Sequence, residues 1–598
     1  MSRVDPHSYF DDAQPRSKAW RLKLDLDFDR RIIKGEIEIS LIAPGAGPLD
    51  LDTKGLTILG ASVPYELGAQ EPILGRRLRL TLPEKTGSVT IRYETSPEAE
   101  GLQWLSPEQT SSRRRPFLFS QCQPIHARSV APCQDSAAAR VSYEAAIVVP
   151  EGLTAVMSAG PAGDASAGPG RRAFRFSMPQ PIPSYLLALA AGELSSRDLS
   201  PRSRVWAEPE VVDKAAWEFA GVEEMLARAE SMFGPYPWDR YDMLVLPPSF
   251  PYGGMENPRM TFLTPTILAG DRSLVDVVAH ELAHSWTGNL VTNATAEHFW
   301  LNEGWTVWAE RRIIGALRGE RAESLAWAIG QKDLDDALER FKDKPELTRL
   351  RTRLTGVDPD DAYSVVPYEK GARFLVVLER AAGKEPFELF VKEYMRRYRF
   401  SSITTEEFCA FVESSFPGLL ARVGAREWLD GAGLSASAPC FVSERLRALS
   451  EIAAGWREGR RPDAAQASRW SAAELLVYLQ ALPDGLDAAD CASLEALLGL
   501  DGRGNCEVLC LWLCLSAAAG REEAFPQARA LLSSVGRVKF VRPLYQALGR
   551  TPKGRAVARE IFAEAAPAYH ALTRRAARAV IEKYPDEPSA RRASPARS

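Results

Sequence analysis

The sequence predicts a multidomain α+β protein with a β-rich N-terminal part, a mixed central part and an all-helical C-terminal part. Its 598 residues exceed what a single hydrophobic core accommodates. Apolar residues alternate with polar ones near the N-terminus, whereas Ala- and Leu-rich stretches of helical length follow residue 433. We expect domains at 1–195, 196–433 and 434–585, and a disordered tail at 586–598.

The N-terminal part has the pattern of half-buried strands. Every second residue is apolar in 20–28, 37–41, 78–82 and 89–93, which predicts antiparallel strands with one face in the core. The segment 159–170 is rich in Gly, Ala and Pro and is predicted to be an exposed hairpin connection.

Helical patterns dominate after residue 200. Apolar spacing predicts helices in the central part at 215–232, 273–287, 304–317 and 368–382, with one strand at 243–246. It predicts an all-helical C-terminal domain from 472–482, 506–518, 527–532, 554–565 and 568–583. Stacked helix pairs of armadillo or HEAT type are one arrangement of these helices, although the sequence has no repeat of fixed period. Cys506, Cys510 and Cys514 share one face of a predicted helix, and their apolar neighbours favour core cysteines over a second metal site.

Charge and hydropathy exclude two classes of partner. The chain holds 74 Lys and Arg against 78 Asp and Glu, a formal net charge of −4, so it lacks the positive field that nucleic acids require. It shows no secretory signal and no apolar run of about 18 residues. We therefore expect neither a nucleic-acid nor a membrane partner. Eight sparse cysteines predict free thiols in a cytoplasmic protein.

The clearest chemical motif is an HExxH sequence, His280-Glu281-Leu282-Ala283-His284, in a chain with only six histidines. On a helix, residues four apart share a face, so both imidazoles point the same way. Glu303 follows after 18 further residues and is the natural candidate for a third ligand. Each residue alone is more often structural, but the three together favour one Zn²⁺ per chain with an open position for water.

A glycine pair precedes this motif by about two dozen residues. Gly253 and Gly254 let the backbone approach an extended substrate, and Glu256 supplies a fixed negative charge for a free α-ammonium. The alternative is a Gly/Pro turn with an exposed glutamate. The zinc motif downstream favours the binding role.

Together, the GGMEN and HExxH-x18-E segments resemble the gluzincin zinc aminopeptidases, and further segments resemble the leukotriene A4 hydrolase and aminopeptidase B group. The resemblance covers nearly the whole chain. It implies an N-terminal antiparallel β-saddle, a thermolysin-like catalytic domain and a C-terminal α-helical superhelix. The further segments lie at 119–123, 358–364, 366–371, 536–540 and 542–544.

The resemblance also implies a role for individual residues. His280, His284 and Glu303 would bind zinc, Glu281 would be the general base for the attacking water, and Tyr368 would stabilise the oxyanion. Glu256 and Gln121 would bind the substrate amine, Arg537 and Lys539 its carboxylate, and Asp360 would lie deep in the pocket. The implied substrate-binding residues are Gln121, Gln123, Tyr252, Gly253, Gly254, Met255, Glu256, Asp360, Tyr363, Arg537 and Lys539.

These observations predict a zinc-dependent aminopeptidase that trims short peptides with a free amino terminus. Two alternatives stay open. The same site would suit an epoxide hydrolase acting on an unsaturated fatty-acid epoxide, with Arg537 on the carboxylate and Asp360 guiding water. The second alternative is a non-catalytic protein whose helical domain is an interaction module. The complete HExxH-x18-E motif argues against this alternative.

Overall fold

The computed structural model describes residues 5–584 and forms two compact units, each of which we describe by itself. Within these residues, the first unit contains everything up to Leu246, Gly254–Leu263 and Leu274–Arg445. The second unit contains Pro247–Gly253, Thr264–Ser273 and the chain from Leu446 onward. The predicted tail at 586–598 lies outside the described residues.

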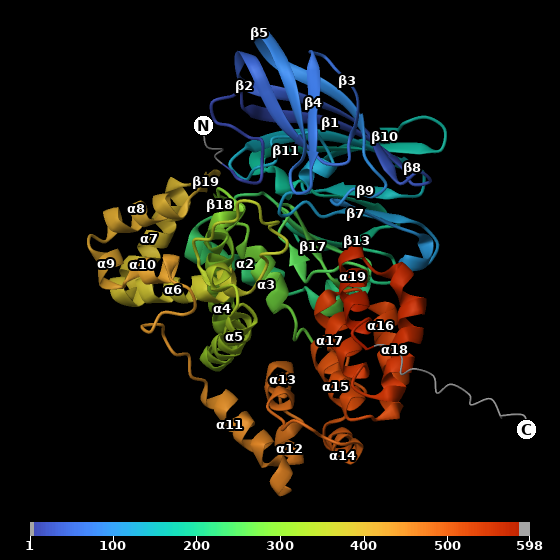
Figure 1. The fold of residues 1–598 in the computed structure, drawn as a ribbon, viewed down its shortest axis with the longest axis vertical. Helices are drawn as coiled ribbons and strands as arrows, with labels where there is room; N and C mark the ends of the chain where they lie inside the picture. The colour runs from blue at the N-terminus through green and yellow to red at the C-terminus, as the bar shows by residue number, and fades with distance from the viewer. Residues whose placement is uncertain (1–4, 585–598) are drawn as a thin grey trace, which may run out of the picture. The chain divides into compact units, whose positions relative to one another are not determined.

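The first unit opens with an eight-stranded sheet (Figure 1). Its strands are β1 (Ser17–Asp27), β2 (Ile32–Thr53), β3 (Thr57–Ala61), β4 (Tyr65–Glu71), β5 (Gly75–Glu94), β8 (Arg140–Pro150), β10 (Gly160–Ser166) and β11 (Arg171–Pro183). Their order is β10-β11-β8-β1-β2-β5-β3, with β4 also paired to β5. Trp20, Leu22 and Leu24 of β1 are buried while Lys23 faces solvent, which confirms the predicted period of two.

One pairing in this sheet is parallel, so the sheet is not purely antiparallel. β1 runs antiparallel to β2 but parallel to β8. The two parallel strands are separated in the chain by residues 28–139, which include two strands of a second, four-stranded sheet, so no hairpin has to join them. That four-stranded sheet consists of β6 (Leu102–Leu105), β7 (Phe117–Ser120), β9 (Thr154–Met157) and β12 (Leu189–Gly192).

The predicted connection at 159–170 is largely a strand. Its first half forms β10, which pairs antiparallel with β11, and only 167–170 turns between them. Most of the β10 residues are exposed. This edge strand is held by backbone hydrogen bonds to β11 alone. Its Gly, Pro and Ala residues show no alternation of apolar and polar side chains, so the sequence pattern did not indicate a strand.

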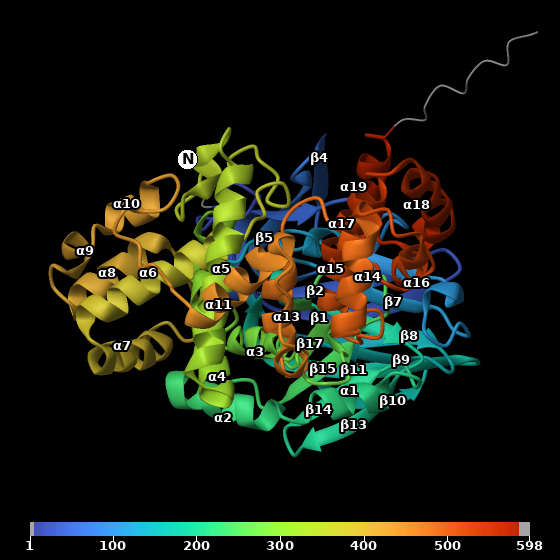
Figure 2. The same cartoon turned by 90° about the horizontal axis from the view of Figure 1, so that it is seen from below.

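A five-stranded sheet, a strand pair and ten helices complete the first unit up to residue 430. The strands are β13 (Ser195–Ser200), β14 (Ser203–Ala207), β15 (Tyr241–Val245), β16 (Gly254–Met255), β17 (Met260–Leu263), β18 (Val291–Asn293) and β19 (Ser401–Ile403). The helices are α1 (Val212–Glu218), α2 (Val222–Phe233), α3 (Asp276–Ala283), α4 (Trp300–Arg318), α5 (Glu320–Arg340), α6 (Val366–Ala382), α7 (Lys384–Arg397), α8 (Thr405–Ser415), α9 (Leu419–Arg422) and α10 (Ala425–Asp430). Helices α6 to α10 gather on one side of α4 in both views (Figures 1 and 2).

Helices α4 and α6 pack unusually closely because glycine faces glycine. A Cβ atom added to Gly304 of α4 would lie 2.8 Å from the backbone of Gly371 in α6. The absence of both side chains lets the two backbones approach. Glu303 directly precedes Gly304, and Tyr368 lies one turn before Gly371. The crossing therefore brings Glu303 close to Tyr368.

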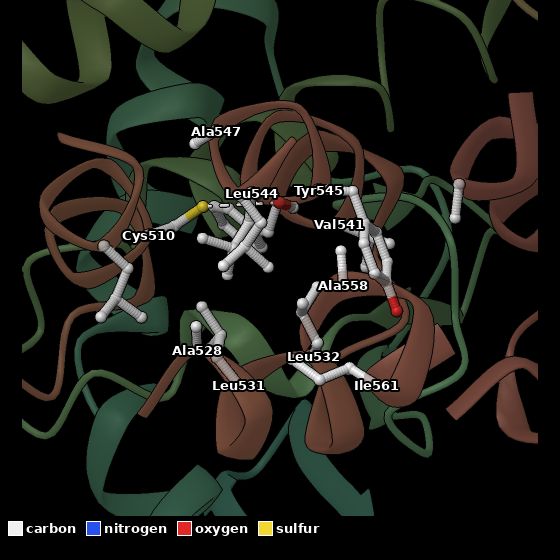
Figure 3. Close-up of a cluster of buried hydrophobic side chains, with 14 of the residues drawn as sticks. Cys510, Ala528, Leu531, Leu532, Val541, Leu544, Tyr545, Ala547, Ala558 and Ile561 are labelled. Atoms are coloured by element: carbon white, nitrogen blue, oxygen red, sulfur yellow. Dashed lines mark hydrogen bonds between the residues drawn. The ribbon is translucent and has the colours of Figure 1, made fainter. Parts of the chain in front are cut away.

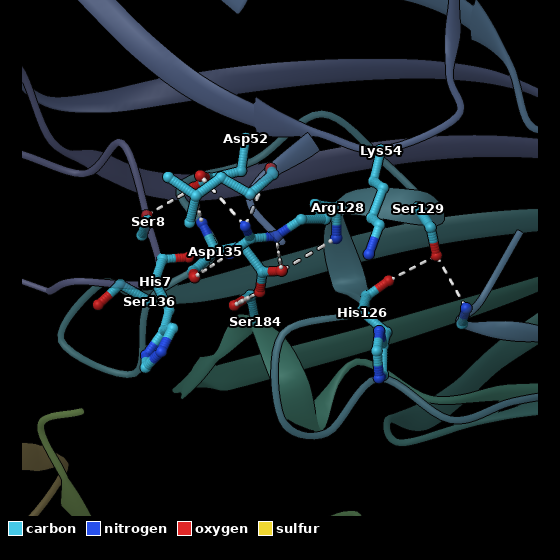
Figure 4. Close-up of polar contacts among 12 residues, drawn as sticks. His7, Ser8, Asp52, Lys54, His126, Arg128, Ser129, Asp135, Ser136 and Ser184 are labelled. Carbon is cyan, nitrogen blue, oxygen red and sulfur yellow. Dashed lines mark hydrogen bonds and ion pairs between the residues drawn. The ribbon is translucent and has the colours of Figure 1, made fainter. Parts of the chain in front are cut away.

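A buried polar cluster anchors the segment that follows β7 (Figure 4). Arg128 is fully buried, and its guanidinium pairs with Asp135 at 2.9 Å and with Asp52 of β2 at 3.7 Å. It also donates a hydrogen bond to the carbonyl of His7 at 2.7 Å. Because the buried charges are paired and hydrogen-bonded, this cluster fixes residues 121–135 on the eight-stranded sheet.

The second unit is helical in its C-terminal part, as predicted. Its core joins Leu532, Val541, Leu544 and Ile561 from three successive helices (Figure 3). Cys510 lies in this core, and Cys506 and Cys514 pack against it, so the apolar role predicted for them is confirmed. The helices from residue 444 are α11 (Glu444–Ala454), α12 (Ala464–Ala467), α13 (Ala472–Gln480), α14 (Ala488–Leu498), α15 (Cys506–Ala518), α16 (Phe525–Ser534), α17 (Val538–Leu548), α18 (Pro552–Ala565) and α19 (Ala571–Ile581).

Within residues 5–584, no helix has both the length and the hydropathy needed to cross a membrane. All eight cysteines lie in this described part and are free thiols.

Candidate metal centre and substrate site

Three side chains of the first unit converge as a candidate metal centre. His280 lies in α3, His284 caps its C-terminal end, and Glu303 lies in the first turn of α4. The two imidazole Nε2 atoms are 3.2 Å apart, and Oε2 of Glu303 lies 3.4 Å from one and 3.5 Å from the other. Tetrahedral zinc with bonds of about 2.0–2.1 Å separates its ligand atoms by about 3.3 Å. The three residues therefore fit zinc.

The hydrogen bonds of the imidazoles explain why these atoms face one another. Nδ1 of His284 lies 2.9 Å from the carbonyl oxygen of Thr287. Because this oxygen can only accept a hydrogen bond, Nδ1 carries the hydrogen and Nε2 carries the lone pair. Nδ1 of His280 contacts the Glu310 carboxylate at 2.9 Å in the same way. Burial lowers the pKa of His284 to about 4. Two nitrogen lone pairs beside a carboxylate are repulsive unless a cation binds between them.

Glu281 is held beside the candidate metal centre by a close backbone approach. A Cβ atom on Gly254 of β16 would lie 2.4 Å from Oε1 of Glu281, so only glycine fits there. Glu281, Glu256 and His284 each offer one atom, and these atoms lie within 4.8 Å of one another. Glu281 is 6% exposed. Two buried carboxylates thus lie side by side next to the candidate metal centre.

Glu256 is buried and tied to the segment after β7. Nε2 of Gln123 donates to its carboxylate at 3.2 Å, and the Asn289 side chain donates to its backbone carbonyl at 2.7 Å. Burial, followed by the charges of Glu281 and Glu303, raises the pKa of Glu256 well above its ordinary value. Such a carboxylate gains strongly from a cationic partner.

Gln121 contacts Met255 rather than Glu256. Its Nε2 lies 3.2 Å from Sδ of Met255, and its Oε1 is buried without a hydrogen-bond donor among the described residues. The structure therefore places Gln123, rather than Gln121, on the Glu256 carboxylate.

Tyr368 of α6 lies over the imidazole of His280. The two rings stack with their centroids 6.0 Å apart and an angle of 15° between their planes. The Tyr368 hydroxyl is 3.2 Å from that of Tyr363. Burial, followed by the charge of Glu303, raises the pKa of Tyr368 well above its ordinary value. The phenol therefore stays protonated at neutral pH and can donate a hydrogen bond.

Asp360 lies in the loop that carries Tyr363 and is paired with His126. Its Oδ2 atom is 3.1 Å from Nε2 of His126. This histidine lies three residues beyond Gln123, so the same segment contacts both Glu256 and Asp360.

The remaining predicted residues lie in the second unit, as the division of the chain falls between Gly253 and Gly254. The Arg537 side chain is 14% exposed, lies 3.7 Å from the Glu507 carboxylate, and packs against Gly253. Lys539 is 58% exposed and pairs with Glu507 at 2.7 Å. Tyr252 contacts the ring of Phe250. Arg537 is thus a largely buried cation rather than a solvated one.

Sequence reasoning missed the groups that orient the candidate metal ligands. Glu310, the partner of His280, lies two helical turns beyond Glu303 in α4 and so shares its face. Its spacing of seven from a ligand was the available signal. Thr306, whose hydroxyl lies 3.0 Å from Nδ1 of His284, and His126 offered no comparable signal.

Family models and relatives agree with this geometry. The models for the peptidase M1 N-terminal domain, the peptidase family M1 domain and the leukotriene A4 hydrolase C-terminal domain match residues 14–186, 217–426 and 470–581. Leukotriene A-4 hydrolase of Xenopus laevis is 39% identical over 577 residues, which span 92% of this chain and 95% of that protein. The chain belongs to peptidase family M1.

Other M1 relatives extend the match over nearly the whole chain. Leucine aminopeptidase 2 of Ajellomyces capsulatus is 37% identical over 600 residues, covering 95% of this chain and 96% of the relative. The structure of yeast LTA4 hydrolase in complex with Bestatin superimposes with a TM-score of 0.90 at 31% identity, covering 97% and 98% of the two chains. M1 membership confirms the predicted family, the three-part architecture and the zinc aminopeptidase class.

Proposed function

We propose that this M1 enzyme removes single residues from the amino end of short peptides, with one zinc ion per chain. The observation that carries the proposal is the cluster of Glu256, Glu281 and His284, whose ligand atoms lie within 4.8 Å of one another. A carboxylate that binds an α-ammonium beside a hydrolytic base limits cleavage to the first peptide bond. The test is a screen of aminoacyl amides and tripeptides on the zinc-loaded protein, and an inactive protein would contradict the proposal.

In the proposed reaction, Glu256 binds the substrate α-ammonium, and Gln123 orients the Glu256 carboxylate. Glu281 accepts a proton from the attacking water and transfers it to the leaving amine. The Tyr368 hydroxyl donates a hydrogen bond to the carbonyl oxygen as that oxygen gains negative charge. Zinc held by His280, His284 and Glu303 would supply Lewis acidity and lower the pKa of water.

Removal of the carboxylate ligand should abolish metal binding. Glu303→Ala leaves two imidazoles, which do not satisfy a catalytic zinc site, so we expect most zinc and activity to be lost. Elemental analysis of the folded variant measures this, with Glu320→Ala as control because Glu320 is exposed on α5 of the same unit. A folded Glu303→Ala protein that retains one zinc ion per chain would overturn the ligand assignment.

Asp360, Tyr363 and Met255 are proposed to line the region that receives the first side chain of the substrate. Tyr363 contacts Tyr368, and Met255 directly precedes Glu256. Asp360 lies in the Tyr363 loop and is 31% exposed. A carboxylate there would interact with basic first side chains.

Arg537 is proposed to bind the substrate carboxylate, with Lys539 and the Tyr252–Gly253 backbone beside it. The burial of Arg537 and its loose 3.7 Å pairing with Glu507 support this role. A charge-assisted hydrogen bond contributes roughly 1.5–3 kcal/mol, so tripeptide acids should be cleaved about ten- to hundredfold better than their amides.

The comparison of tripeptide acids with amides tests the carboxylate site. Arg537→Ala should abolish the preference while leaving hydrolysis of small aminoacyl amides unchanged. Values of kcat/KM for one tripeptide in both forms measure it. Equal cleavage of acid and amide by the wild type would remove Arg537 from the substrate site.

Epoxide hydrolysis of an unsaturated fatty acid is the second candidate activity. It is favoured by the 39% identity to a protein named leukotriene A-4 hydrolase and by the presence of Arg537 and Asp360. Turnover of a fatty-acid epoxide by the wild type, and its loss in Asp360→Asn, would establish it. The free thiols favour a cytoplasmic location for either activity.

A further inference from the structure

Four charged side chains of alternating sign form a chain that ends at Asp360. Lys54 pairs with Glu100 at 2.8 Å, Glu100 with Nδ1 of His126 at 3.3 Å, and Nε2 of His126 with Asp360 at 3.1 Å. The side chains of Lys54 and His126 are 18% and 14% exposed, whereas those of Glu100 and Asp360 are 45% and 31% exposed. The two cations are thus the better buried members.

The backbone around His126 is held on both sides. Its amide donates to the carbonyl of Cys122 at 2.8 Å, and its carbonyl accepts from the hydroxyl of Ser129 at 2.7 Å (Figure 4). Arg128, two residues later, is locked by its pairing with Asp135. The backbone that carries the imidazole is therefore fixed by hydrogen bonds on both sides.

Two members of this chain of charges, His126 and Asp360, lie on segments that contact the candidate site. The segment of His126 also carries Gln123, which donates to Glu256. The loop of Asp360 also carries Tyr363, whose hydroxyl contacts that of Tyr368. The pair of His126 and Asp360 therefore joins the element beside the amine-binding carboxylate to the element beside the oxyanion donor.

His126 is a cation at neutral pH because two carboxylates flank it. Burial lowers the pKa of His126. The neighbouring carboxylates of Asp360 and Glu100 raise it by more, so that the pKa of His126 is raised to about 9. The close approach of the His126 imidazole, with a smaller effect from Lys54, lowers the pKa of Glu100 to about 2. Asp360 is thus half of an ion pair rather than an isolated negative charge.

We propose that His126 is a positioning residue for specificity: by pairing with Asp360, it weakens the preference of the site for cationic first side chains relative to neutral ones. The proposal rests on the proposed function in one respect, namely that Asp360 faces the first side chain. The proposal predicts that the preferred substrates are peptides with an uncharged first residue. Peptides with a basic first residue should be cleaved less well than they would be if Asp360 were not paired with His126.

The test compares two substrates that differ only in side-chain charge. The amides of arginine and of citrulline have nearly the same shape, and titration of the α-amine and of the catalytic groups cancels in the ratio of their kcat/KM values. His126→Gln keeps a hydrogen-bond donor for Asp360 but removes the charge. We expect it to raise the arginine-to-citrulline ratio about tenfold at pH 7, the order expected for one unit charge at this separation.

The pH dependence provides a second readout. In the wild type the ratio should be low up to about pH 8 and rise as His126 loses its proton near pH 9, whereas in His126→Gln it should be high throughout. Glu100→Gln removes one of the two carboxylates that hold the proton, so the rise should move to lower pH with unchanged plateaus. Because Glu100 is half-exposed, this variant also tests the proposal if His126→Gln folds poorly.

The variants separate failure of this proposal from failure of the proposed function. Asp360→Asn should lower the ratio below the wild-type value. If it does, but His126→Gln and Glu100→Gln leave both the ratio and its pH profile unchanged, the role of His126 is wrong and the pocket assignment stands. If Asp360→Asn leaves the ratio unchanged, Asp360 does not face the first side chain and both assignments are overturned.

Discussion

Glu281→Gln is expected to lower kcat about 100- to 10,000-fold while the protein keeps its zinc. The amide has the size of the carboxylate but cannot accept a proton from the attacking water. Glu281 lies on the same helix as His280, yet its carboxylate faces Gly254 and Glu256. The measurement is kcat on one aminoacyl amide together with the zinc content of the same sample.

Zinc content distinguishes the two roles that a glutamate can have at this site. Substitution of the proposed ligand Glu303 should remove zinc and activity together, whereas Glu281→Gln should remove activity alone. If Glu281→Gln lost its zinc, Glu281 would be a ligand. If its kcat were unchanged, another group would have to accept the proton.

Local patterns in the sequence predicted most of the fold. Strand β1 was found because its apolar residues alternate over a full strand length. Helix α15 was found with its observed bounds because almost all of its residues are apolar. By contrast, the helix predicted at 273–287 is shorter at both ends. It starts only at Asp276, where no side chain caps it, and it ends at Ala283. Strand β10 is held by backbone pairing and buries few side chains, so its hydropathy pattern does not indicate a strand.

The candidate site was predictable where its residues are close in the sequence. The spacing of four between His280 and His284 places both on one helical face, and the structure brings Glu303 to them across the crossing of Gly304 with Gly371. His126 and Asp360 are 234 residues apart. Their pairing depends on where two loops of different elements meet, and a single sequence contains no local signal for it.

Glu256→Gln is expected to lower kcat/KM for a peptide with a free amino terminus about 100- to 1,000-fold, because it leaves the buried α-ammonium without its counter-charge. Acetylation of the same peptide removes the ammonium and should cost the wild type a similar factor. The Glu256→Gln substitution and the acetylation each remove the same interaction between Glu256 and the ammonium. The loss in kcat/KM when both are made should therefore be little larger than the loss from either one. The measurement is kcat/KM for the free and acetylated peptide with both proteins. Additive losses would mean that Glu256 and the ammonium do not interact, and equal cleavage of both peptides by the wild type would show that the enzyme does not select for a free amino terminus.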